Sequence, residues 1–431
     1  MKFCDITMAY NAKSGGIKTY IDEKRRFLRE NTDYEHLLII PGARDRVRRS
    51  GRTTTVTIKS PLLPGQTAYR FFISPTKIKQ VLLEEAPSAV ELGSYYTEPW
   101  AAFAYRRRIR EAGGDCLLGA YFHTDVAKAY VAAPMRAAAY NWLRDVSEAL
   151  AGGVEKLADV AATGAQRYIR YVFSHCDLKF AASPSQAARL QEYGVEDIEI
   201  VPMGVDLKLF SPRRRSAEVR ARYGADEKTV VVVFAGRLCA EKRVLTIVKA
   251  FEALPSGMPA QLWLMGDGPQ RTDVETAAAR NPNIRVFDYE SDRGRFSELL
   301  ASADLYVSAG PFETFAISVI EAQASGLPVV GVNAGALRER VPYGLGALGP
   351  VDDAEAMAAN IVRAAHDRAA VGARARAHIV EHFGWSKALG KLLASYEAKL
   401  PDRAPPAQPR PHIGAEMLAA LPIALASLPL I

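Results

Sequence analysis

Short apolar runs, each followed by a turn and then by a helical pattern, recur along both halves of the chain. The clearest run, residues 231–235, is apolar at every position, as is typical of a strand buried on both faces of a sheet. A comparable run at residues 116–122 lies in the N-terminal half. Because strands that alternate with helices form parallel sheets covered by helices, the pattern predicts the α/β class with two doubly wound, Rossmann-like domains.

The strand–helix pattern restarts after Pro202, Met203 and Gly204, so we place a domain boundary there. The expected parts are an N-terminal domain, a C-terminal domain, a final helix, and a Pro-rich linker with an apolar tail. Their residues are 1–203, 204–383, 384–400 and 401–431. The tail from residue 413 holds one charged side chain and two prolines, which makes it short and interrupted for a membrane span. A tail that dips into a membrane and a disordered end both stay open.

The net charge of the 431-residue chain is +7, and residues 1–203 carry +5 of it. This mild excess suits a phosphorylated substrate or an anionic surface and falls short of the basic patches typical of nucleic-acid-binding proteins. A predicted loop near residue 50 is rich in arginine and is either simply solvated or attracted to anionic lipid headgroups. These arginines are Arg44, Arg46, Arg48, Arg49 and Arg52.

The four cysteines are scattered and have no metal-ligand spacing, so we expect free thiols and no metal site. No signal peptide precedes the first strand, which favours a cytoplasmic location.

The stretch at residues 310–330 places two glutamates eight positions apart. Glu313 follows an apolar strand and precedes a helix expected from about Thr314, and Glu321 lies about two turns further along that helix. The backbone N–H groups of Thr314, Phe315 and Ala316 would then form a helix start, which attracts phosphate. One carboxylate at the phosphate end and one deeper suit a diphosphate flanked by two sugars; the alternative is a buried helix with a solvated first glutamate.

Two cations follow the apolar strand at residues 231–235. Gly236 and Arg237 end that strand, and Lys242 lies five residues beyond Arg237, so that both cations could reach one diphosphate and neutralise a leaving group. The alternative is a surface salt-bridge cluster with Glu241. The next strand ends in a Gly-Asp-Gly-Pro turn that begins at Gly266, and its glycines allow a nucleotide to lie against the backbone.

Two features of the N-terminal half point to the same chemistry. Gly15 and Gly16 separate the first strand from a helix, which permits close approach of a phosphate, although a plain tight turn is the alternative. The G-x-G-x-x-G fingerprint of dinucleotide-binding proteins is missing, so a Rossmann oxidoreductase is disfavoured. His123 follows the strand at residues 116–122, at the edge where parallel sheets bind ligands; a purely structural histidine is the alternative.

In this order and at these intervals, the motifs resemble those of the retaining nucleotide-sugar glycosyltransferases of family 4. The resemblance runs from the first strand to about Leu400. The matching stretches are residues 14–17, 201–206, 236–238 with 241–242, 266–269, 313–321 and 325–330. It implies the GT-B fold, in which two doubly wound domains face each other across a cleft and the C-terminal helix crosses back to the N-terminal domain.

The resemblance also implies roles for individual residues. Arg237 and Lys242 would hold the donor diphosphate, Glu321 would bind the ribose, and Glu313 would contact the transferred sugar. His123 would orient hydroxyl groups beside the reacting sugar. The implied donor site comprises Gly15, Gly16, Gly236, Arg237, Lys242, Gly266, Thr314, Phe315, Ala316 and Glu321, and the implied catalytic groups are Arg237, Lys242, Glu313 and His123. The family usually has glycine where this chain has Ala316. The difference matters because alanine, unlike glycine, disfavours a positive φ.

We therefore expect retaining, metal-independent transfer of a hexose, of glucose or mannose type, from a UDP-sugar or GDP-sugar to an acceptor hydroxyl. No cofactor and no nucleic acid is expected. The acceptor is expected to be a sugar or lipid-linked glycan, with peripheral association at the cytoplasmic face of an anionic membrane. Two alternatives stay open: a nucleotide-sugar hydrolase or epimerase on the same fold, and a non-catalytic protein that binds sugar nucleotides.

Overall fold

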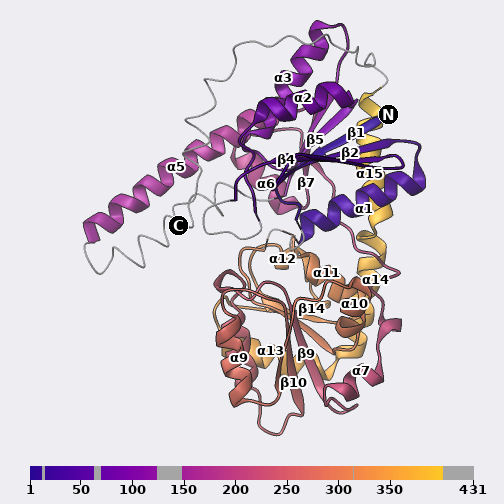
Figure 1. The fold of residues 1–431 in the computed structure, drawn as a ribbon. Coiled ribbons are helices and arrows are strands. Elements are labelled where there is room, and N and C mark those ends of the chain that lie inside the picture. Colours follow the sequence, from indigo (N-terminus) through magenta and orange to yellow (C-terminus); the bar gives the residue numbers. More distant parts are fainter. Residues whose placement is uncertain (12–14, 63–68, 124–147, 314, 401–431) are drawn as a thin grey trace. The chain divides into compact units, whose positions relative to one another are not determined.

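The computed structural model describes residues 1–11, 15–62, 69–123, 148–313 and 315–400. They form two compact units, of which unit 1 comprises Met1–Pro202 and the chain from Leu389 on, and unit 2 comprises Met203–Ala388 (Figure 1). The boundary falls one residue before the expected one. The expected linker and tail at residues 401–431 lie outside the described residues.

Unit 1 is built on one sheet with the strand order β3-β4-β2-β1-β5-β6-β7-β8. Its strands are β1 (Lys2–Ile6), β2 (Glu35–Gly42), β3 (Arg46–Ser50), β4 (Thr53–Lys59), β5 (Ala89–Leu92), β6 (Leu117–Phe122), β7 (Leu178–Ala181) and β8 (Glu199–Ile200). Neighbouring strands are parallel except for β3, which pairs antiparallel with β4.

The arginine-rich segment near residue 50 was expected to be a loop, and this expectation is wrong. Residues 46–50 form β3, the edge strand of the sheet, and β4 lies between β3 and β2. Every residue of β3 is exposed. Charged side chains on an edge strand discourage pairing with another chain, which explains why this strand carries arginines rather than the alternating apolar pattern of a buried strand.

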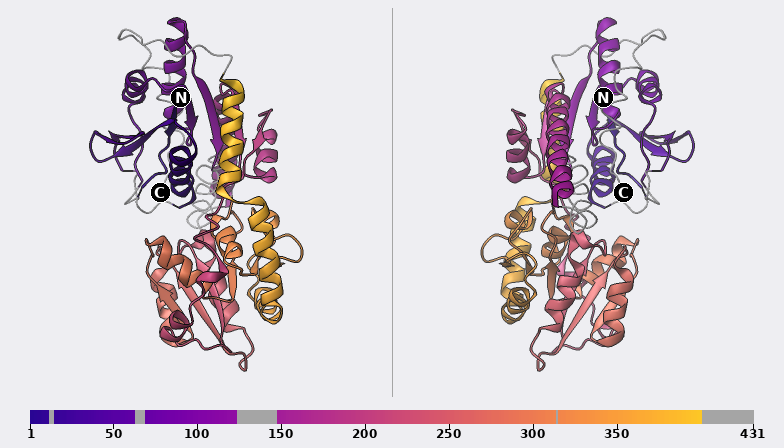
Figure 2. Two further views of the ribbon diagram at one scale, coloured as in Figure 1. Left: turned by 90° about the vertical axis from the view of Figure 1, so that its right-hand side faces the viewer. Right: turned by 90° about the vertical axis from the view of Figure 1, so that its left-hand side faces the viewer.

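The helices of unit 1 are α1 (Gly16–Asn31), α2 (Pro75–Glu85), α3 (Glu98–Glu111), α5 (Glu148–Ser174), α6 (Pro184–Glu192) and α15 (Trp385–Lys399), of which unit 1 includes the part from Leu389 on. Ser74 and Ser183 cap α2 and α6 by accepting a backbone N–H in the first turn. α15 lies against the sheet (Figure 2). The ring of Tyr396 in this helix contacts Phe3 of β1 and Phe180 of β7.

A buried ionic network joins α1 to the sheet of unit 1. Lys24 of α1 is 2% exposed, and its Nζ lies 2.8 Å from Oδ1 of Asp5 and 2.7 Å from Oε1 of Glu91. Tyr396 of α15 donates to Oε2 of Glu91 over 3.1 Å. Removing one partner of such a network leaves an uncompensated buried charge, at a cost of roughly 3–5 kcal/mol. The network therefore fixes α1 and α15 on the same sheet.

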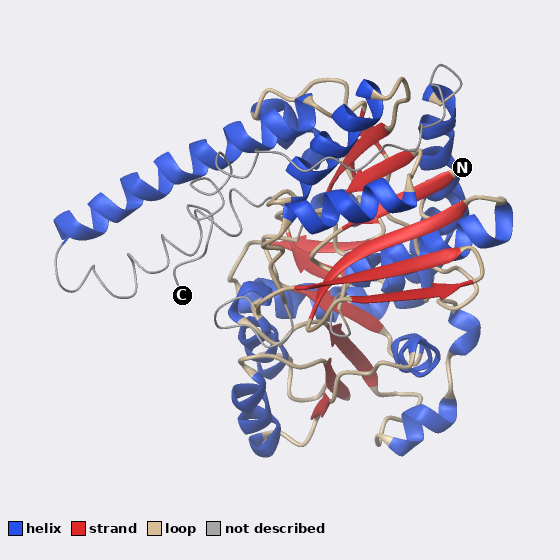
Figure 3. Cartoon of the chain, turned by 45° about the horizontal axis from the view of Figure 1, so that its top comes forward, coloured by secondary structure: helices blue, strands red, loops and turns tan. Residues whose placement is uncertain are grey.

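Unit 2 contains a parallel sheet with the strand order β11-β10-β9-β12-β13-β14. Its strands are β9 (Val230–Ala235), β10 (Ala260–Met265), β11 (Ile284–Phe287), β12 (Leu305–Ser308), β13 (Val329–Val332) and β14 (Gly346–Gly349). β9 and β10 are buried at every residue, as expected for strands covered on both faces by helices (Figure 3).

The helices of unit 2 connect these strands in chain order. They are α7 (Ala217–Arg222), α8 (Val244–Glu252), α9 (Arg271–Arg280), α10 (Arg293–Ala301), α11 (Ile317–Ala324), α12 (Leu337–Arg340), α13 (Ala354–His366) and α14 (Arg368–His382), with the 3₁₀ turns η3 (Pro212–Arg214) and η4 (Ala240–Lys242).

Each sheet has one place where the strand order reverses. In unit 1 the chain starts at β1, builds outward to β3 on one side, and then continues from β5 on the other side. In unit 2 the reversal lies between β9 and β12. Doubly wound sheets bind ligands beyond the carboxyl ends of the strands at this reversal, because the loops there diverge and leave a crevice. The loops after β1, β5, β9 and β12 are therefore the places to look for a site.

Candidate active site

The loops after β9 and β12 bring Lys242 and Glu313 together. The Nζ of Lys242, in η4, lies 2.6 Å from Oε1 of Glu313. Gly310 lies next to this pair, but a Cβ there would lie 3.4 Å from the same carboxylate oxygen and 3.5 Å from the Cα of Lys242, which is ordinary contact, so the approach does not depend on glycine. Burial lowers the pKa of Lys242, but the charge and the hydrogen bond of Glu313 outweigh it, and the net pKa is raised. Lys242 therefore stays protonated at neutral pH.

Arg237 lies in the same loop after β9 and is exposed. Its side chain makes no hydrogen bond or ion pair with any residue in the described ranges. The salt-bridge cluster that we considered forms without it, since Lys242 lies 3.8 Å from Glu241 and pairs more closely with Glu313. Arg237 thus lies where the strand order of the sheet reverses. No described side chain neutralises its positive charge.

The turn that carries Glu313 is held by the loop after β13. The backbone N–H of Ala336 donates to the carbonyl of Glu313 over 2.8 Å. Gly335 has a φ of +52°, and a Cβ there would come within 2.7 Å of the carbonyl oxygen of Pro311. Only glycine therefore fits without displacing the turn. Thr314, the next expected donor-site residue, lies outside the described residues.

The helix after Glu313 begins later than the sequence indicated. α11 starts at Ile317 rather than near Thr314, and Ala316 precedes it with φ 60° and ψ 58°. By helix geometry the leading amides are those of Ile317 and Ser318, so the expected set of amides at residues 314–316 is wrong by about three residues. The cause is the left-handed conformation of Ala316, which an α-helix cannot include.

Phe315 is buried rather than exposed to a ligand. Its ring lies 4.2 Å from the guanidinium carbon of Arg340, and the Nε of Arg340 donates to its carbonyl over 3.2 Å. Its side chain therefore anchors the turn, and only its backbone remains available for binding.

Glu321 lies in α11, 4% exposed, and its carboxylate pairs with the guanidinium of Arg293 at the start of α10. Burial raises the pKa of Glu321, whereas the charge of Arg293 opposes that rise. Arg293 also lies over the rings of Phe210 and Phe296, at 4.9 and 5.2 Å. Our sequence analysis missed Arg293. One feature of the sequence could have indicated this role: Arg293 lies in the first turn of a helix, where the helix dipole disfavours a cation unless a carboxylate lies close.

The glycines after β9 and β10 serve contact between the two loops. Gly266 has a φ of +146°, and a Cβ on it would lie 2.0 Å from the carbonyl oxygen of Gly236. Gly268 would clash similarly with the carbonyl of Leu238, at 2.3 Å. We had attributed these glycines to a nucleotide lying against the backbone. The loop packing requires them in the absence of any ligand, so their role in binding stays a prediction.

In unit 1, Gly15 precedes α1, which begins at Gly16. Gly15 is exposed and has a φ of −87°, and a Cβ on it would meet no atom within 4 Å. Neither its conformation nor the described surroundings require glycine there, which weakens the interpretation as a plain tight turn. The preceding residues 12–14 lie outside the described residues.

His123 follows β6 and is 6% exposed. Its ring stacks on that of Tyr121 at 4.2 Å and meets the edge of Tyr20, from α1, at 5.0 Å. Burial and the charge of Lys24 lower its pKa to about 3, so the imidazole is neutral at physiological pH. Its Nδ1 is buried and has no hydrogen-bond partner among the described residues. Such an atom is costly to leave unsatisfied, so Nδ1 is available for a hydrogen bond to water, to a residue outside the described ranges or to a bound molecule.

Taken together, unit 2 presents cations, a paired carboxylate and helix-start amides at one edge of its sheet, which suits a polyanion with a hydroxyl-bearing group attached. Across the described ranges, no group of three or more His, Cys, Asp or Glu side chains is placed to hold a metal ion. In the same ranges no helix has the length and hydrophobicity needed to cross a bilayer.

Comparison with known proteins agrees with this geometry. Residues 14–209 match the family model described as Glycosyltransferase Family 4, and residues 229–367 match that described as Glycosyl transferases group 1. A GDP-mannose-dependent alpha-(1-6)-phosphatidylinositol dimannoside mannosyltransferase from Mycobacterium tuberculosis is 31% identical over 409 residues, covering 92% of this chain and 96% of the relative. The chain belongs to glycosyltransferase family 4.

Other family 4 relatives and solved structures agree. A GDP-mannose-dependent alpha-mannosyltransferase from Corynebacterium glutamicum is 27% identical, with 73% of this chain and 68% of the relative covered. Sucrose-phosphate synthase from Thermosynechococcus elongatus superposes with a TM-score of 0.70 at 18% identity, over 93% of this chain and all of that one. HepE from Anabaena, solved with UDP, gives 0.67 at 16% identity, over 92% and 100%. The fold is GT-B, as the sequence predicted, and the chain is a glycosyltransferase that uses a nucleotide sugar.

Proposed function

We propose that this glycosyltransferase moves mannose from GDP-mannose to a hydroxyl of a lipid-linked acceptor with retention of configuration. The observation that carries the proposal is the Lys242–Glu313 pair at the carboxyl ends of β9 and β12, together with Arg237 of the same β9 loop, which no described side chain pairs. The choice of GDP-mannose is supported by the relatives from Mycobacterium and Corynebacterium, whose names specify that donor.

In the proposed donor complex, Arg237 and Lys242 bind the diphosphate and Glu321 accepts hydrogen bonds from the ribose. Glu313 accepts hydrogen bonds from the mannose hydroxyls with the oxygen that Lys242 leaves free. The bond from the anomeric carbon to the phosphate oxygen breaks, and the acceptor oxygen bonds to that carbon on the same face. The acceptor proton moves to the leaving phosphate, whose charge the two cations stabilise. Because these cations neutralise the leaving group, we propose that no metal is needed.

Unit 1 is proposed to bind the acceptor and to contribute further groups that contact the donor. Gly15 and Gly16 would approach the donor phosphates, and the unpartnered Nδ1 of His123 would bind a hydroxyl group of the reacting sugar. The neutral ring suits this role, since it can donate or accept a hydrogen bond without carrying charge. The expected catalytic groups are thus Arg237, Lys242, Glu313 and His123.

The exposed arginines of β3 favour peripheral association with anionic lipid at the cytoplasmic face of a membrane. Arg46 and Arg48 are exposed and make no side-chain ion pair within the described ranges. We expect the chain to co-sediment with anionic vesicles, and we expect the bound fraction to fall when Arg46 and Arg48 are both replaced by glutamine. A further test removes residues 413–431 and repeats the measurement. If no form of the chain binds these vesicles, a soluble sugar becomes the better acceptor.

The donor is tested by thermal shift with GDP, UDP and ADP, of which we expect GDP to stabilise the chain most. Transfer is then measured from labelled GDP-mannose to phosphatidylinositol mannosides. Arg237→Ala should lower turnover by roughly a hundredfold, about 2.7 kcal/mol. Arg280→Ala, an exposed arginine of the same unit at the end of α9, is the control and should leave turnover unchanged.

The same assays separate the alternatives. Release of free sugar, or of a sugar inverted at C2, without acceptor would identify a hydrolase or an epimerase. Tight GDP-mannose binding without turnover on any acceptor would identify a non-catalytic binding protein. Full activity of Arg237→Ala would refute the assignment of the donor site.

A further inference from the structure

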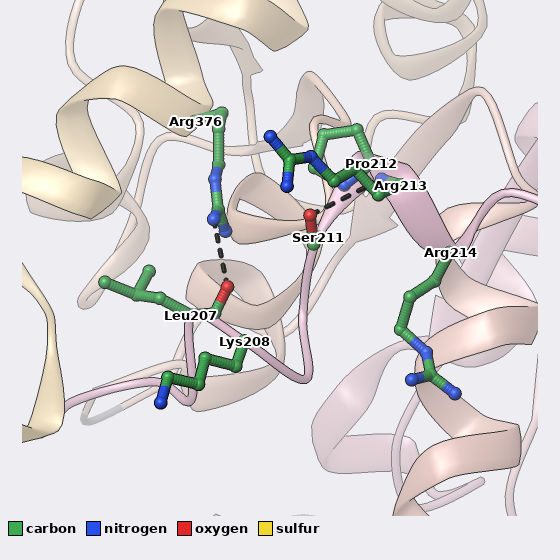
Figure 4. Close-up of a pocket in the computed structure, with 7 residues that line it drawn as sticks. All are labelled: Leu207, Lys208, Ser211, Pro212, Arg213, Arg214 and Arg376. Carbon is green, nitrogen blue, oxygen red and sulfur yellow. Dashed lines mark hydrogen bonds between the residues drawn. The ribbon is translucent and has the colours of Figure 1, made fainter.

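A pocket of about 650 Å³ opens in unit 2 away from the residues assigned to the donor. It is formed by the segment between residues 207 and 214 and by one side chain of α14 (Figure 4). Its lining residues are Leu207, Lys208, Ser211, Pro212, Arg213, Arg214 and Arg376. Four of these seven residues are cationic and none is acidic. None of them belongs to the proposed donor site.

Arg376 builds the wall of this pocket. Its Nη1 donates to the carbonyls of Phe210 and Ala324, at 2.5 and 2.6 Å, and its Nη2 donates to the carbonyl of Leu207 over 3.0 Å. These bonds fix the segment that follows Met203 onto the end of α11. Because neutral carbonyls take up its hydrogen bonds, Arg376 keeps its full positive charge inside the pocket wall.

Arg213 points toward Arg376 (Figure 4), and none of the lining residues is acidic. Burial, and then the charge of Arg213, lower the pKa of Arg376, which is the effect expected of two like charges in proximity. Within the described ranges, the side chains of Arg213 and Lys208 form neither a hydrogen bond nor an ion pair. Arg214 donates one hydrogen bond, from Nη2 to the carbonyl of Gly294 over 3.1 Å. No acidic side chain of the described residues therefore pairs with the cations Lys208, Arg213, Arg214 and Arg376 of the pocket.

We propose that this pocket binds a phosphoryl group, carried either by a soluble phosphate ester or by a lipid headgroup. A guanidinium fork matches the oxygens of a phosphate in shape as well as in charge, and Lys208 adds a point charge at the same opening. A dianion there would remove the repulsion between Arg213 and Arg376 and would use the donors that the protein leaves free. The site is separate from the donor diphosphate and does not depend on the proposed transfer reaction.

The probe is inorganic pyrophosphate, measured by calorimetry on the full chain. The background carries Arg237→Ala and Lys242→Ala, so that the donor site contributes little to the signal. Adding Lys208→Gln and Arg213→Gln should weaken pyrophosphate binding at least tenfold. Both side chains are exposed and form no hydrogen bond or ion pair within the described ranges, so these changes should leave the unfolding temperature nearly unchanged. The matched control is Lys249→Gln with Arg280→Gln, an exposed lysine and arginine elsewhere in unit 2, which should bind like the background.

A second arm identifies the source of the phosphate. Vesicles of phosphatidylcholine, with and without phosphatidylinositol, are co-sedimented with the same three proteins: the background, the Lys208→Gln/Arg213→Gln variant and the matched control. Loss of phosphatidylinositol-dependent binding only in the Lys208→Gln/Arg213→Gln variant assigns a lipid headgroup, and loss of pyrophosphate binding alone assigns a soluble phosphate. If that variant and the control behave alike in both arms, the pocket is merely a solvated basic surface and the proposal is overturned.

Discussion

Ala316 occupies a backbone conformation that L-amino acids seldom adopt. Its φ of 60° places it in the left-handed region directly before α11, and a left-handed alanine costs roughly 1–2 kcal/mol. Ala316→Gly removes that strain but adds freedom to the unfolded chain. The net expectation is a stabilisation of up to about 1 kcal/mol, seen as a rise of about 2–4 °C in the melting temperature of a unit of this size.

A control of opposite sign is available in the same unit. Ala279, exposed in α9, has ordinary helical geometry, so Ala279→Gly should destabilise the protein by about 1 kcal/mol. A lower melting temperature for both variants would mean that the Cβ of Ala316 contributes more through packing than it costs in strain.

Arg293 is expected to set the affinity for the donor through Glu321. Burial raises the pKa of that carboxyl and Arg293 opposes the rise, so Arg293→Ala should raise the pKa further. A group with a raised pKa is protonated at higher pH, so the acid limb of kcat/KM should move to higher pH. We also expect KM for the donor to rise about tenfold, since a protonated carboxyl accepts ribose hydroxyls poorly. The measurement is the pH profile of transfer.

Arg293→Lys keeps the positive charge and should return the acid limb of the kcat/KM profile most of the way to its original pH. Arg295→Ala, two residues along α10, should leave the position of that limb unchanged. If Arg293→Ala instead lowers KM, Arg293 competes with the ribose for Glu321 and must leave when the donor binds.

At the scale of elements, Gly119 allows α15 to pack closely against the sheet of unit 1. A Cβ on this β6 residue would lie 1.9 Å from the hydroxyl oxygen of Tyr396. Gly119→Ala therefore overpacks the contact and should cost about 1–3 kcal/mol, measured by thermal or urea unfolding. Gly119→Ala with Tyr396→Phe removes the clashing oxygen and should recover part of that loss.

The control is Gly164→Ala on α5, where a Cβ would meet no atom within 4 Å. That change should stabilise the helix by about 0.5–1 kcal/mol. Equal effects of the two alanine substitutions would show that α15 adapts to a Cβ at residue 119.

Strands and their end loops could be predicted because their signals are local. Residues 231–235 were expected as a strand and lie in β9, and Lys242 and Glu313 were both expected near one diphosphate and lie 2.6 Å apart. Their roles in binding stay predictions. The contacts that the sequence did not indicate join residues that are far apart along the chain. The salt bridge of Arg293 with Glu321, and that of Lys24 with Glu91, join positions 28 and 67 residues apart. The edge position of β3 follows from its pairing with β4 alone.

At the scale of the whole molecule, each unit has its own sheet and its own buried core, which is the condition for independent unfolding. We therefore expect two transitions in scanning calorimetry of the full chain. GDP at a hundredfold excess over its Kd stabilises the part that binds it by about 2.7 kcal/mol. If the donor site lies within unit 2, as proposed, only one transition should move, by roughly 5–10 °C for a unit of this size.

The variants described above show which unit gives rise to each transition, without truncation of the chain. Ala316→Gly should raise the same transition that GDP raises, because Ala316 and the proposed donor residues Arg237, Lys242 and Glu321 all belong to unit 2. Gly119→Ala should lower the other transition, because β6 and Tyr396 belong to unit 1. A single transition that all three changes displace would mean that the two cores unfold together. A GDP shift confined to the transition that Gly119→Ala lowers would place the nucleotide on unit 1 and contradict the proposed donor site.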